Sequence, residues 1–417
     1  MIGNLKQKTY EFLRKTQKYT GTDNVYLAKG GFWLSLGKFF ALGISFLSAI
    51  AFANLLNPAT YGNYKYVLSL VGMLGIFSLT GISTAISQAV ARGLEGSFYA
   101  GFKTRLKWAL LGSLVALGMA GYYWRQGNNL LILPLILTAI FLPLLNASHL
   151  YTSFLSGKKI FNAQAQYGIL SQVISTGAII AALFLTKNLF WLIAVYFISN
   201  TFLESFFYLL TKFKFRPNKK EDSQTIPYGK YLTLLDIVSV VGSYLDKILL
   251  FSLVGPAQLA IYSFATLPPE QLKGFAEENI NSLAFPKLAA KSPEEIKANI
   301  MKKVWRLAIL AGIMVMGYFL LAPYIYKIFF PQYLNSILYS QIFTLSFIFL
   351  PTIFLSNVFE AKMMKKELYT LKLIISPLKI ILYLILIPLY GIWGVIAAIL
   401  LAGGICAALT LFLFRRV

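Results

Sequence analysis

The stretch KFKFRPNKKEDSQTIPYGK, residues 212–230, is the longest polar segment inside the chain and lies near its midpoint. It combines Pro217, Pro227 and Gly229 with a run of charges and has no apolar periodicity, a pattern typical of a linker. Long apolar runs fill the sequence on both sides of it. We therefore predict a flexible linker that joins two halves, each built from membrane-spanning helices.

Twelve apolar runs flank this linker, six before it and six after it. Each can cross a hydrocarbon core of about 30 Å, which takes about 20 helical residues. With 58% hydrophobic and 13% charged residues, the chain has too little polar surface for a soluble domain of its length. We predict an all-α polytopic membrane protein with spans at residues 28–56, 62–90, 106–124, 130–155, 165–186, 189–211, 231–254, 257–285, 304–328, 335–360, 369–390 and 391–414.

The connectors between these runs alternate between strongly basic and almost uncharged. On the weakly charged side the only basic residues are Arg125, Lys187 and Lys327. Because cytoplasmic loops retain Lys and Arg, we expect both termini and the linker in the cytoplasm. The net charge of +23 then reflects topology and contact with anionic lipid headgroups, and we expect no nucleic-acid partner.

The predicted organisation is a cytoplasmic segment at 1–27, a six-helix bundle at 28–211, the linker, and a second six-helix bundle at 231–414. Residues 1–27 lack the apolar stretch of a cleavable signal peptide, so we expect the first span to be retained. Since six spans return the chain to its starting side, the halves are expected to be parallel repeats.

A weak internal repeat supports this expectation. LLNPATYGNY (55–64) after the first run aligns with LVGPAQLAIY (253–262) after the seventh, with Leu, Pro, Ala and Tyr identical at one common offset. The alternative is that both segments only end a helix at the outer interface, where Pro is common.

Four segments together resemble a known family: LLNPATYGNY (55–64), GISTAISQAVAR (81–92), YLDKILLFSLVGPAQLAIYSFA (244–265) and IPLYGIWGVIAA (387–398). In their order and spacing they resemble the polysaccharide flippases, the Wzx-type O-antigen and exopolysaccharide transporters of the multidrug/oligosaccharidyl-lipid/polysaccharide (MOP) superfamily. The resemblance runs from about residue 25 to the end of the chain. The related lipid II flippases usually carry two further helices that this sequence lacks, which disfavours that subfamily.

The resemblance implies two pseudo-symmetric six-helix bundles, arranged as a V around a central cavity. It also implies transport of an undecaprenyl-diphosphate-linked oligosaccharide from the cytoplasmic to the outer leaflet of the bacterial cytoplasmic (inner) membrane. The expected partners are this lipid-linked oligosaccharide, membrane lipids, and a polysaccharide polymerase or other assembly proteins.

Ionisable residues within the spans are the candidate site, because buried charges in membranes usually face a cavity. In the seventh span, Asp236, Ser239, Ser243 and Asp246 recur at helical spacing and form one stripe. Lys247 lies about 100° round the helix from Asp246, so we expect it to pair with another group. The alternatives for Asp246 and Lys247 are a functional role or a structural interhelical ion pair. Asp236 lies nearer the cytoplasmic end, as an interfacial residue.

The eighth span is the most polar. It carries Pro268 and Pro269 near mid-depth, followed by Glu270, Lys273 and Glu277 on one face. A proline pair frees backbone carbonyls, which membranes tolerate where protein or water satisfies them, so this span predicts a hydrated cavity. Glu270 and Lys273 either face that cavity or neutralise each other as an i, i+3 pair.

Lys379 is the strongest candidate for contact with an anion, since it lies near mid-membrane just after Pro377 and reaches neither surface easily. Lys38 in the first span is a second candidate, with snorkelling to headgroups as the alternative. Lys65 is expected to snorkel outward. Glu204 in the sixth span is a candidate partner for one of these lysines.

The chemistry that these residues predict is binding without bond breaking. Lysines in a wet cavity would offset the desolvation of a diphosphate, and Asp246, Glu270, Glu204 or Asp236 would couple transport to H⁺ or Na⁺ or form ion pairs. The sequence has no phosphate-binding loop, a single histidine, His149, and a single cysteine, Cys406, so we expect no cofactor and no metal site. The alternatives are a cation-coupled drug or metabolite exporter of the same superfamily and, less favoured because the outer connectors are short, a membrane glycan polymerase or ligase.

Overall fold

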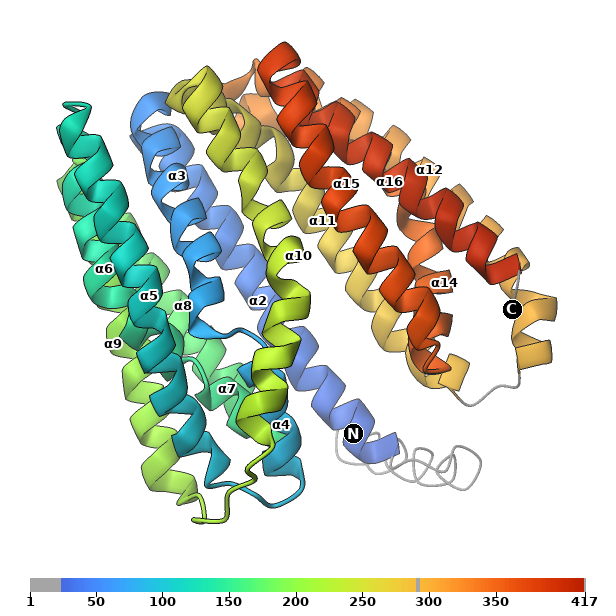
Figure 1. Ribbon diagram of the computed structural model, residues 1–417. Helices are drawn as coiled ribbons and strands as arrows, with labels where there is room; N and C mark the ends of the chain where they lie inside the picture. Colours follow the sequence, from blue (N-terminus) through green and yellow to red (C-terminus); the bar gives the residue numbers. More distant parts are fainter. Residues whose placement is uncertain (1–23, 290–292, 416–417) are drawn as a thin grey trace, which may run out of the picture.

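The computed structural model describes residues 24–289 and 293–415. These residues are almost entirely helical (Figure 1). Most of the predicted N-terminal segment, residues 1–27, lies outside the described part of the chain. The helices before the linker are α2 (Asn24–Leu55), α3 (Pro58–Leu74), α4 (Ile82–Ala91), α5 (Ser97–Arg125), α6 (Asn129–Ser148), α7 (Tyr151–Gly157), α8 (Phe161–Leu185) and α9 (Leu189–Phe215).

The second half of the chain has a matching set of long helices. These are α10 (Thr225–Val254), α11 (Pro256–Ala289), α12 (Pro293–Phe329), α13 (Ser336–Thr344), α14 (Leu350–Ala361), α15 (Lys365–Tyr390) and α16 (Ile392–Arg415). Each predicted span coincides with one helix or with one interrupted helix. Three predicted spans are interrupted: α3 with α4, α6 with α7, and α13 with α14.

Length and composition qualify nine helices in the described residues as membrane spans, or ten if the bent pair Pro58–Ser78 and Ile82–Ala91 is one span. Two predicted spans, α5 and α11, are not in this set, because charged and small residues lower the mean hydropathy of their sequences. The all-α polytopic fold is confirmed. The number twelve stays a prediction.

The break between α3 and α4 is a sharp bend of 52°. Leu79 adopts a left-handed conformation there, with φ of 58°. This conformation is uncommon for residues other than glycine, so the surrounding structure must stabilise it. Arg105 of α5, buried to 5% exposure, donates hydrogen bonds to the Ser78 and Asn146 carbonyls, both at 3.1 Å. A charged side chain therefore satisfies carbonyls that helix breaks leave open in a membrane protein.

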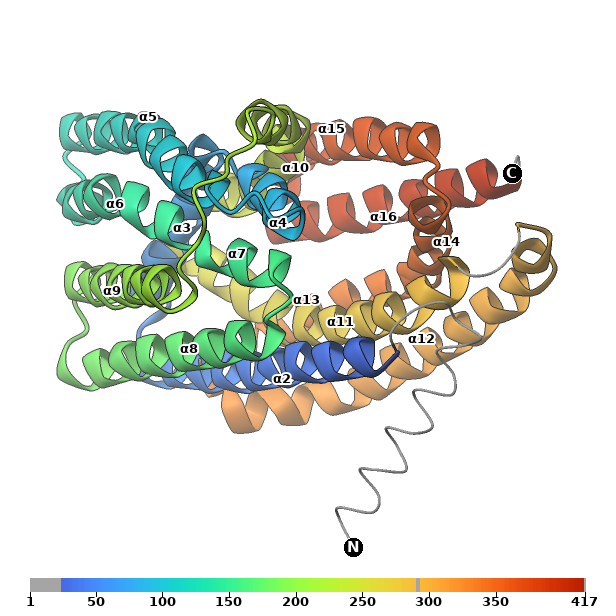
Figure 2. The ribbon, with the colours of Figure 1, turned by 90° about the horizontal axis from the view of Figure 1, so that it is seen from below.

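The helices form two lobes that meet at one end and splay apart at the other, as a V (Figures 1 and 2). In the first lobe α5 packs on α6 and α2 on α8, and in the second α15 packs on α16 and α11 on α14. The start of α2, the linker and the end of α16 all lie toward the splayed end (Figure 1).

The lobes are closed against each other at the apex by α3, α10 and α11. Tyr66 of α3 stacks on Phe251 of α10 with ring centroids 3.8 Å apart. Gly62 of α3 lies against the first residue of α11, so that a Cβ at this position would stand 1.8 Å from the carbonyl oxygen of Pro256. The apex therefore depends on backbone-to-backbone contact.

Helix α10 crosses from one lobe to the other. Its first turns pack on α4, where Thr233 Oγ1 accepts a hydrogen bond from the Gly81 amide at 3.0 Å. Further along, α10 packs on α15. The first turns of a helix that the sequence assigns to the second bundle thus lie against the first lobe.

The linker differs from its prediction, because it is short and held in place. Only residues 216–224 separate α9 from α10, whereas the sequence indicated a flexible stretch of 212–230. Glu95 accepts hydrogen bonds from Lys158 Nζ at 2.5 Å and from the Asn218 amide at 3.0 Å. Burial alone would raise the pKa of Glu95, but these two donors and the Lys158 charge outweigh burial and lower it.

Candidate functional site

A group of charged side chains from four helices lies between the lobes. We define the interlobe cluster as Lys65 of α3, Asp246 and Lys247 of α10, Glu270 and Lys273 of α11, and Lys379 of α15. Glu270 interacts electrostatically with Lys65, Lys247, Lys273 and Asp246. Lys379 interacts with Asp246, Lys247, Glu270 and Lys273. The fold thus brings together residues that are far apart in the sequence.

Asp246 is the buried centre of this cluster, with 4% exposure. Its carboxylate accepts a hydrogen bond from the Tyr262 hydroxyl at 2.7 Å. Lys247 Nζ lies 3.3 and 3.4 Å from the two carboxylate oxygens. The prediction that Lys247 pairs with a group other than its neighbour is therefore wrong. The Cβ atoms of Asp246 and Lys247 are about 100° apart around the helix, but the lysine side chain is long enough to bring its Nζ back to the carboxylate.

Glu270 and Lys273 occupy successive turns of α11, directly after Pro268 and Pro269. The helix is continuous through this proline pair. Lys273 Nζ lies 3.8 Å from Glu277 Oε1, so its salt bridge is with the i+4 residue and not with Glu270. Glu270 interacts electrostatically with Lys65 and Lys247 of the neighbouring helices as well as with Lys273.

Lys379 is half-buried, with Nζ 5.4 Å from the ring centroid of Tyr383 one turn further along α15. Tyr383 is fully buried, and its hydroxyl has no hydrogen-bond partner within the described residues. No carboxylate neighbours Lys379 in its own helix. Asp246 and Glu270 reach its surroundings from α10 and α11.

Lys65 is the cluster residue that the sequence analysis missed, because it was expected to snorkel outward. It is half-buried, lies 5.8 Å from the Tyr61 ring centroid, and interacts electrostatically with Lys247 and Glu270. Its position about 10 Å below the start of α3 was the available signal. Only the packing of α3 on α10 and α11 reveals its charged neighbours.

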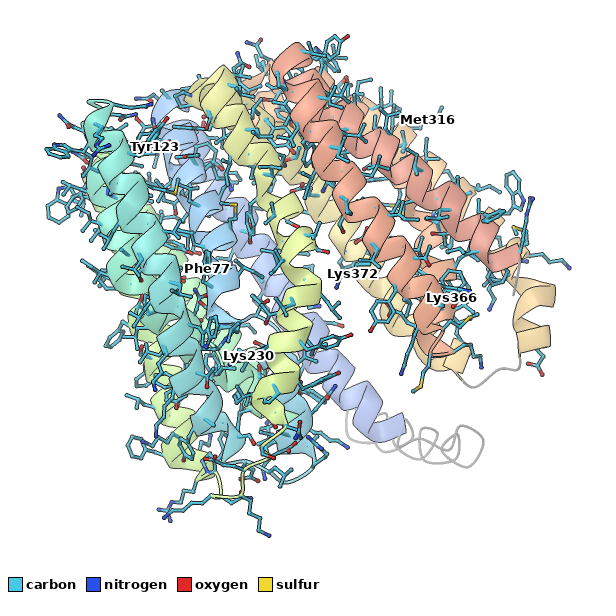
Figure 3. All side chains as sticks on the ribbon, in the orientation of Figure 1. Phe77, Tyr123, Lys230, Met316, Lys366 and Lys372 are labelled. Carbon is cyan, nitrogen blue, oxygen red and sulfur yellow. The ribbon has the colours of Figure 1, made fainter. Side chains whose placement is uncertain are left out.

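Three predicted site residues lie outside the interlobe cluster. Lys38 is exposed on α2. Asp236, about 15 Å below Asp246 along α10, forms an ion pair with Lys372 of α15, which Figure 3 labels on the side of α15 nearest α10. Glu204 accepts or shares a hydrogen bond with His149 Nδ1 at 2.9 Å, so its predicted lysine partner is wrong. His149 lies at the break between α6 and α7, within hydrogen-bond distance of Glu204 in α9.

The interlobe cluster carries four lysines and two carboxylates. Asp246 is already engaged by Tyr262 and Lys247, and Lys273 also by Glu277. Lys65 and Lys379 have only ring contacts and longer-range electrostatic partners among the described residues. The cluster therefore has positive charge in excess, which suits an anionic group held away from bulk water.

Two helical lobes with an ionisable cluster between them define the class, a two-lobed, all-α multi-pass membrane protein. A sequence model of the family described as "Polysaccharide biosynthesis protein" matches residues 27–275, more than half of the chain. The chain belongs to this family. No curated protein matches it significantly.

Solved structures of MOP transporters share the fold. The lipid II flippase MurJ in an inward closed conformation aligns with a TM-score of 0.69 at 15% identity, over 91% of this chain and 87% of that one. An inward-facing multidrug resistance transporter of the MATE family aligns with 0.64 at 14% identity, over 90% and 94%. A MOP superfamily transporter from Pyrococcus furiosus aligns with 0.61 at 14% identity, over 94% and 95%. At these identities the likeness establishes the fold alone.

Proposed function

We propose that this protein is a flippase that moves an undecaprenyl-diphosphate-linked oligosaccharide from the cytoplasmic to the outer leaflet. The observation that carries the proposal is the excess of positive charge in the interlobe cluster, where Lys65 and Lys379 lack a close carboxylate among the described residues. A diphosphate crossing a membrane loses its hydration, and nearby cations offset that cost.

The proposed topology determines which end of the V faces the cytoplasm. With the linker and both termini in the cytoplasm, as the basic connectors predict, the splayed end opens to the cytoplasm and the apex closes the outer side. The headgroup enters between the lobes from the cytoplasmic side and reaches the interlobe cluster. The cytoplasmic end then closes and the apex opens, which releases the headgroup on the outer side. In this proposal the two lobes are the moving bodies in the inner membrane, and the first turns of α10 move with the first lobe.

Coupling to H⁺ or Na⁺ is part of the proposal. Asp246 and Glu270 both face lysines, so protonation of either one, or its binding of a cation, would change how strongly those lysines attract a diphosphate. The cycle needs no hydrolysis and no cofactor. A polymerase or other assembly protein would take the glycan on the outer side.

The test is a deletion strain without a second flippase. Lipid-linked repeat units should accumulate on the cytoplasmic leaflet, while surface polysaccharide falls, and wild-type protein should reverse both effects. Unchanged surface polysaccharide together with increased sensitivity to cationic drugs would favour the second candidate, an exporter with the fold of the multidrug relatives.

A further inference from the structure

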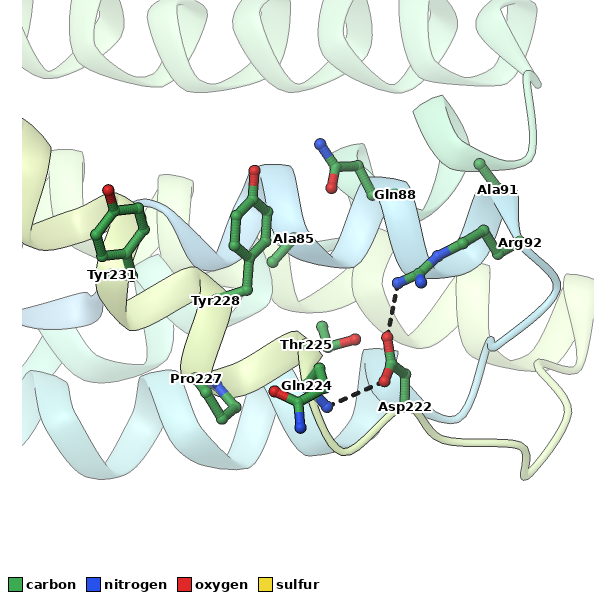
Figure 4. A pocket seen from close by; sticks show the side chains of 10 residues that line it. All are labelled: Ala85, Gln88, Ala91, Arg92, Asp222, Gln224, Thr225, Pro227, Tyr228 and Tyr231. Atoms are coloured by element: carbon green, nitrogen blue, oxygen red, sulfur yellow. Dashed lines mark hydrogen bonds and ion pairs between the residues drawn. The ribbon is translucent and has the colours of Figure 1, made fainter. Parts of the chain in front are cut away.

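A pocket of about 780 Å³ lies between the end of α4 and the start of α10 (Figure 4). Both helix ends lie toward the splayed end of the V (Figure 1). Its volume falls in the range of small-molecule sites. Its lining joins Ala85, Gln88, Ala91 and Arg92 from the first lobe with Asp222, Gln224, Thr225, Pro227, Tyr228 and Tyr231 from the linker and α10.

The walls of this pocket are fixed to each other. Arg92 Nη2 lies 2.6 Å from Asp222 Oδ2, and the other oxygen of Asp222 accepts a hydrogen bond from the Gln224 amide at 3.0 Å. Beyond the pocket, Thr233 Oγ1 of α10 accepts a hydrogen bond from the Gly81 amide at 3.0 Å. The pocket is therefore formed before any ligand arrives, which lowers the entropic cost of binding.

The chemistry of the lining suits a neutral ligand rich in hydroxyl groups. Tyr228 and Tyr231 are 41% and 50% exposed, lie one turn apart, and point to the same side as Gln88 (Figure 4). Their rings offer flat apolar faces, while Gln88 offers both donors and acceptors. The charges of Arg92 and Asp222 cancel, so this pocket lacks the positive excess of the interlobe cluster.

The pocket reaches the second lobe at Tyr231. Tyr231 interacts with Tyr369 of α15 in the second lobe. The neighbouring Lys230 turns the other way, with Nζ 5.0 Å from the ring centroid of Trp108 in α5. Along α10, Tyr231 lies sixteen residues, or about 24 Å, below Lys247 of the cluster.

We propose that this pocket binds the distal sugars of the lipid-linked oligosaccharide and thereby selects substrates by their glycan. The inference rests on the proposed function and extends it. A diphosphate held at the interlobe cluster places its first sugar near Lys247, so only a headgroup of several sugars reaches Tyr228 and Tyr231. The pocket then contributes to binding of long headgroups and leaves short ones unaffected.

The test uses full-length protein in proteoliposomes and two fluorescent probes. One is undecaprenyl diphosphate with a single sugar, and the other carries a complete repeat unit of several sugars. Tyr228→Ala, Tyr231→Ala and Gln88→Ala should each reduce transport of the long probe about 3- to 10-fold, the effect of losing one ring or hydrogen-bond contact, and should leave the short probe unchanged.

Two control variants accompany this series. Tyr228→Phe keeps the ring and should retain most transport of the long probe. Tyr390→Ala removes a tyrosine that is 62% exposed at the apex end of α15 and should affect neither probe.

Each outcome decides between the two proposals. If wild-type protein moves neither probe, the proposed function fails. If wild-type protein moves both and the pocket variants reduce both equally, or neither, the proposed function stands and the sugar site is overturned. If the loss of transport in the pocket variants depends on the anionic lipid content of the vesicles, the pocket binds a lipid headgroup. This result would also overturn the sugar site.

Discussion

A single charge in a membrane interior must be compensated locally, and Lys379 shows how weakly this one is compensated. Its Nζ lies 5.4 Å from the Tyr383 ring centroid, and the carboxylates near it, Asp246 and Glu270, also interact with other lysines. A cation over a ring gains about 1 kcal/mol, much less than a buried ion pair involves. At the scale of the residue, this environment supports the proposal that Lys379 contacts an anionic ligand.

Lys379→Ala should therefore reduce transport strongly while membrane abundance stays near wild type. Lys379→Arg should retain part of the activity, because it keeps the charge but presents a planar fork with different hydration. Transport and abundance are to be measured together. If Lys379 instead neutralises a buried acid, Ala would destabilise the protein by about 3–5 kcal/mol and abundance would fall with transport.

At the scale of the element, the linker and the helix ends around it form a strap on the first lobe. Glu95 joins three segments by accepting from Lys158 and from the amide of Asn218, and Asp222 adds the contact with Arg92. These bonds fix where α10 begins. The strap therefore determines which lobe carries the first turns of α10.

The strap should loosen in acid, because the folded protein lowers the pKa of Glu95. A carboxyl group with a lowered pKa stabilises the fold above its unfolded pKa of about 4.3, and the contribution is lost as pH falls through the folded value. The protection of the amides in residues 216–224 against hydrogen exchange, relative to the intrinsic rate at each pH, should thus decrease from below about pH 4.3. Glu95→Gln should show faster exchange already at neutral pH and a weaker dependence on acid.

The contact between α3 and α11 is also a property of elements, since it needs a residue without a side chain at position 62. Gly62→Ala should destabilise the protein by about 1–3 kcal/mol, because the added Cβ would overlap a backbone carbonyl that cannot rotate away. Thermal unfolding in detergent measures this. Gly118→Ala on α5 is the matched control, since nothing lies within 4 Å of its added Cβ, and it should be neutral or stabilising.

At the scale of the whole molecule, the proposed direction of the V rests on many charges together. The basic residues of the predicted cytoplasmic connectors act in sum, so single charge changes should not invert the topology. In the proposed topology these charges face the cytoplasmic leaflet, whose anionic headgroups would attract them. The proposed orientation thus depends on the chain as a whole.

Cysteine labelling in intact cells tests this orientation, starting from Cys406→Ser, which removes the single native thiol. Gln126→Cys and Lys187→Cys, in exposed connectors near the apex, should react with an impermeant reagent. Ser223→Cys, exposed in the linker, should react only after the membrane is opened. Labelling of Ser223→Cys in intact cells would invert the proposed topology and the direction of transport with it.

The sequence by itself determined the membrane class, the helical segments and the two-part organisation of the chain. Hydrophobicity and basic connectors are local properties, and spans of about 20 apolar residues leave the backbone no alternative to a helix. The same reasoning found Asp246, Glu270 and Lys379, because a charge within an apolar run is visible without knowing its neighbours.

Only the tertiary structure decided which charges meet. Lys65 lies in the interlobe cluster because α3 packs on α10 and α11. Glu204 of α9 contacts His149, which lies at the break between α6 and α7. The ordered strap around Glu95 was hidden by a composition typical of loops. Such contacts join residues distant along the chain, and spacing within one helix carries no information about the face that another helix presents.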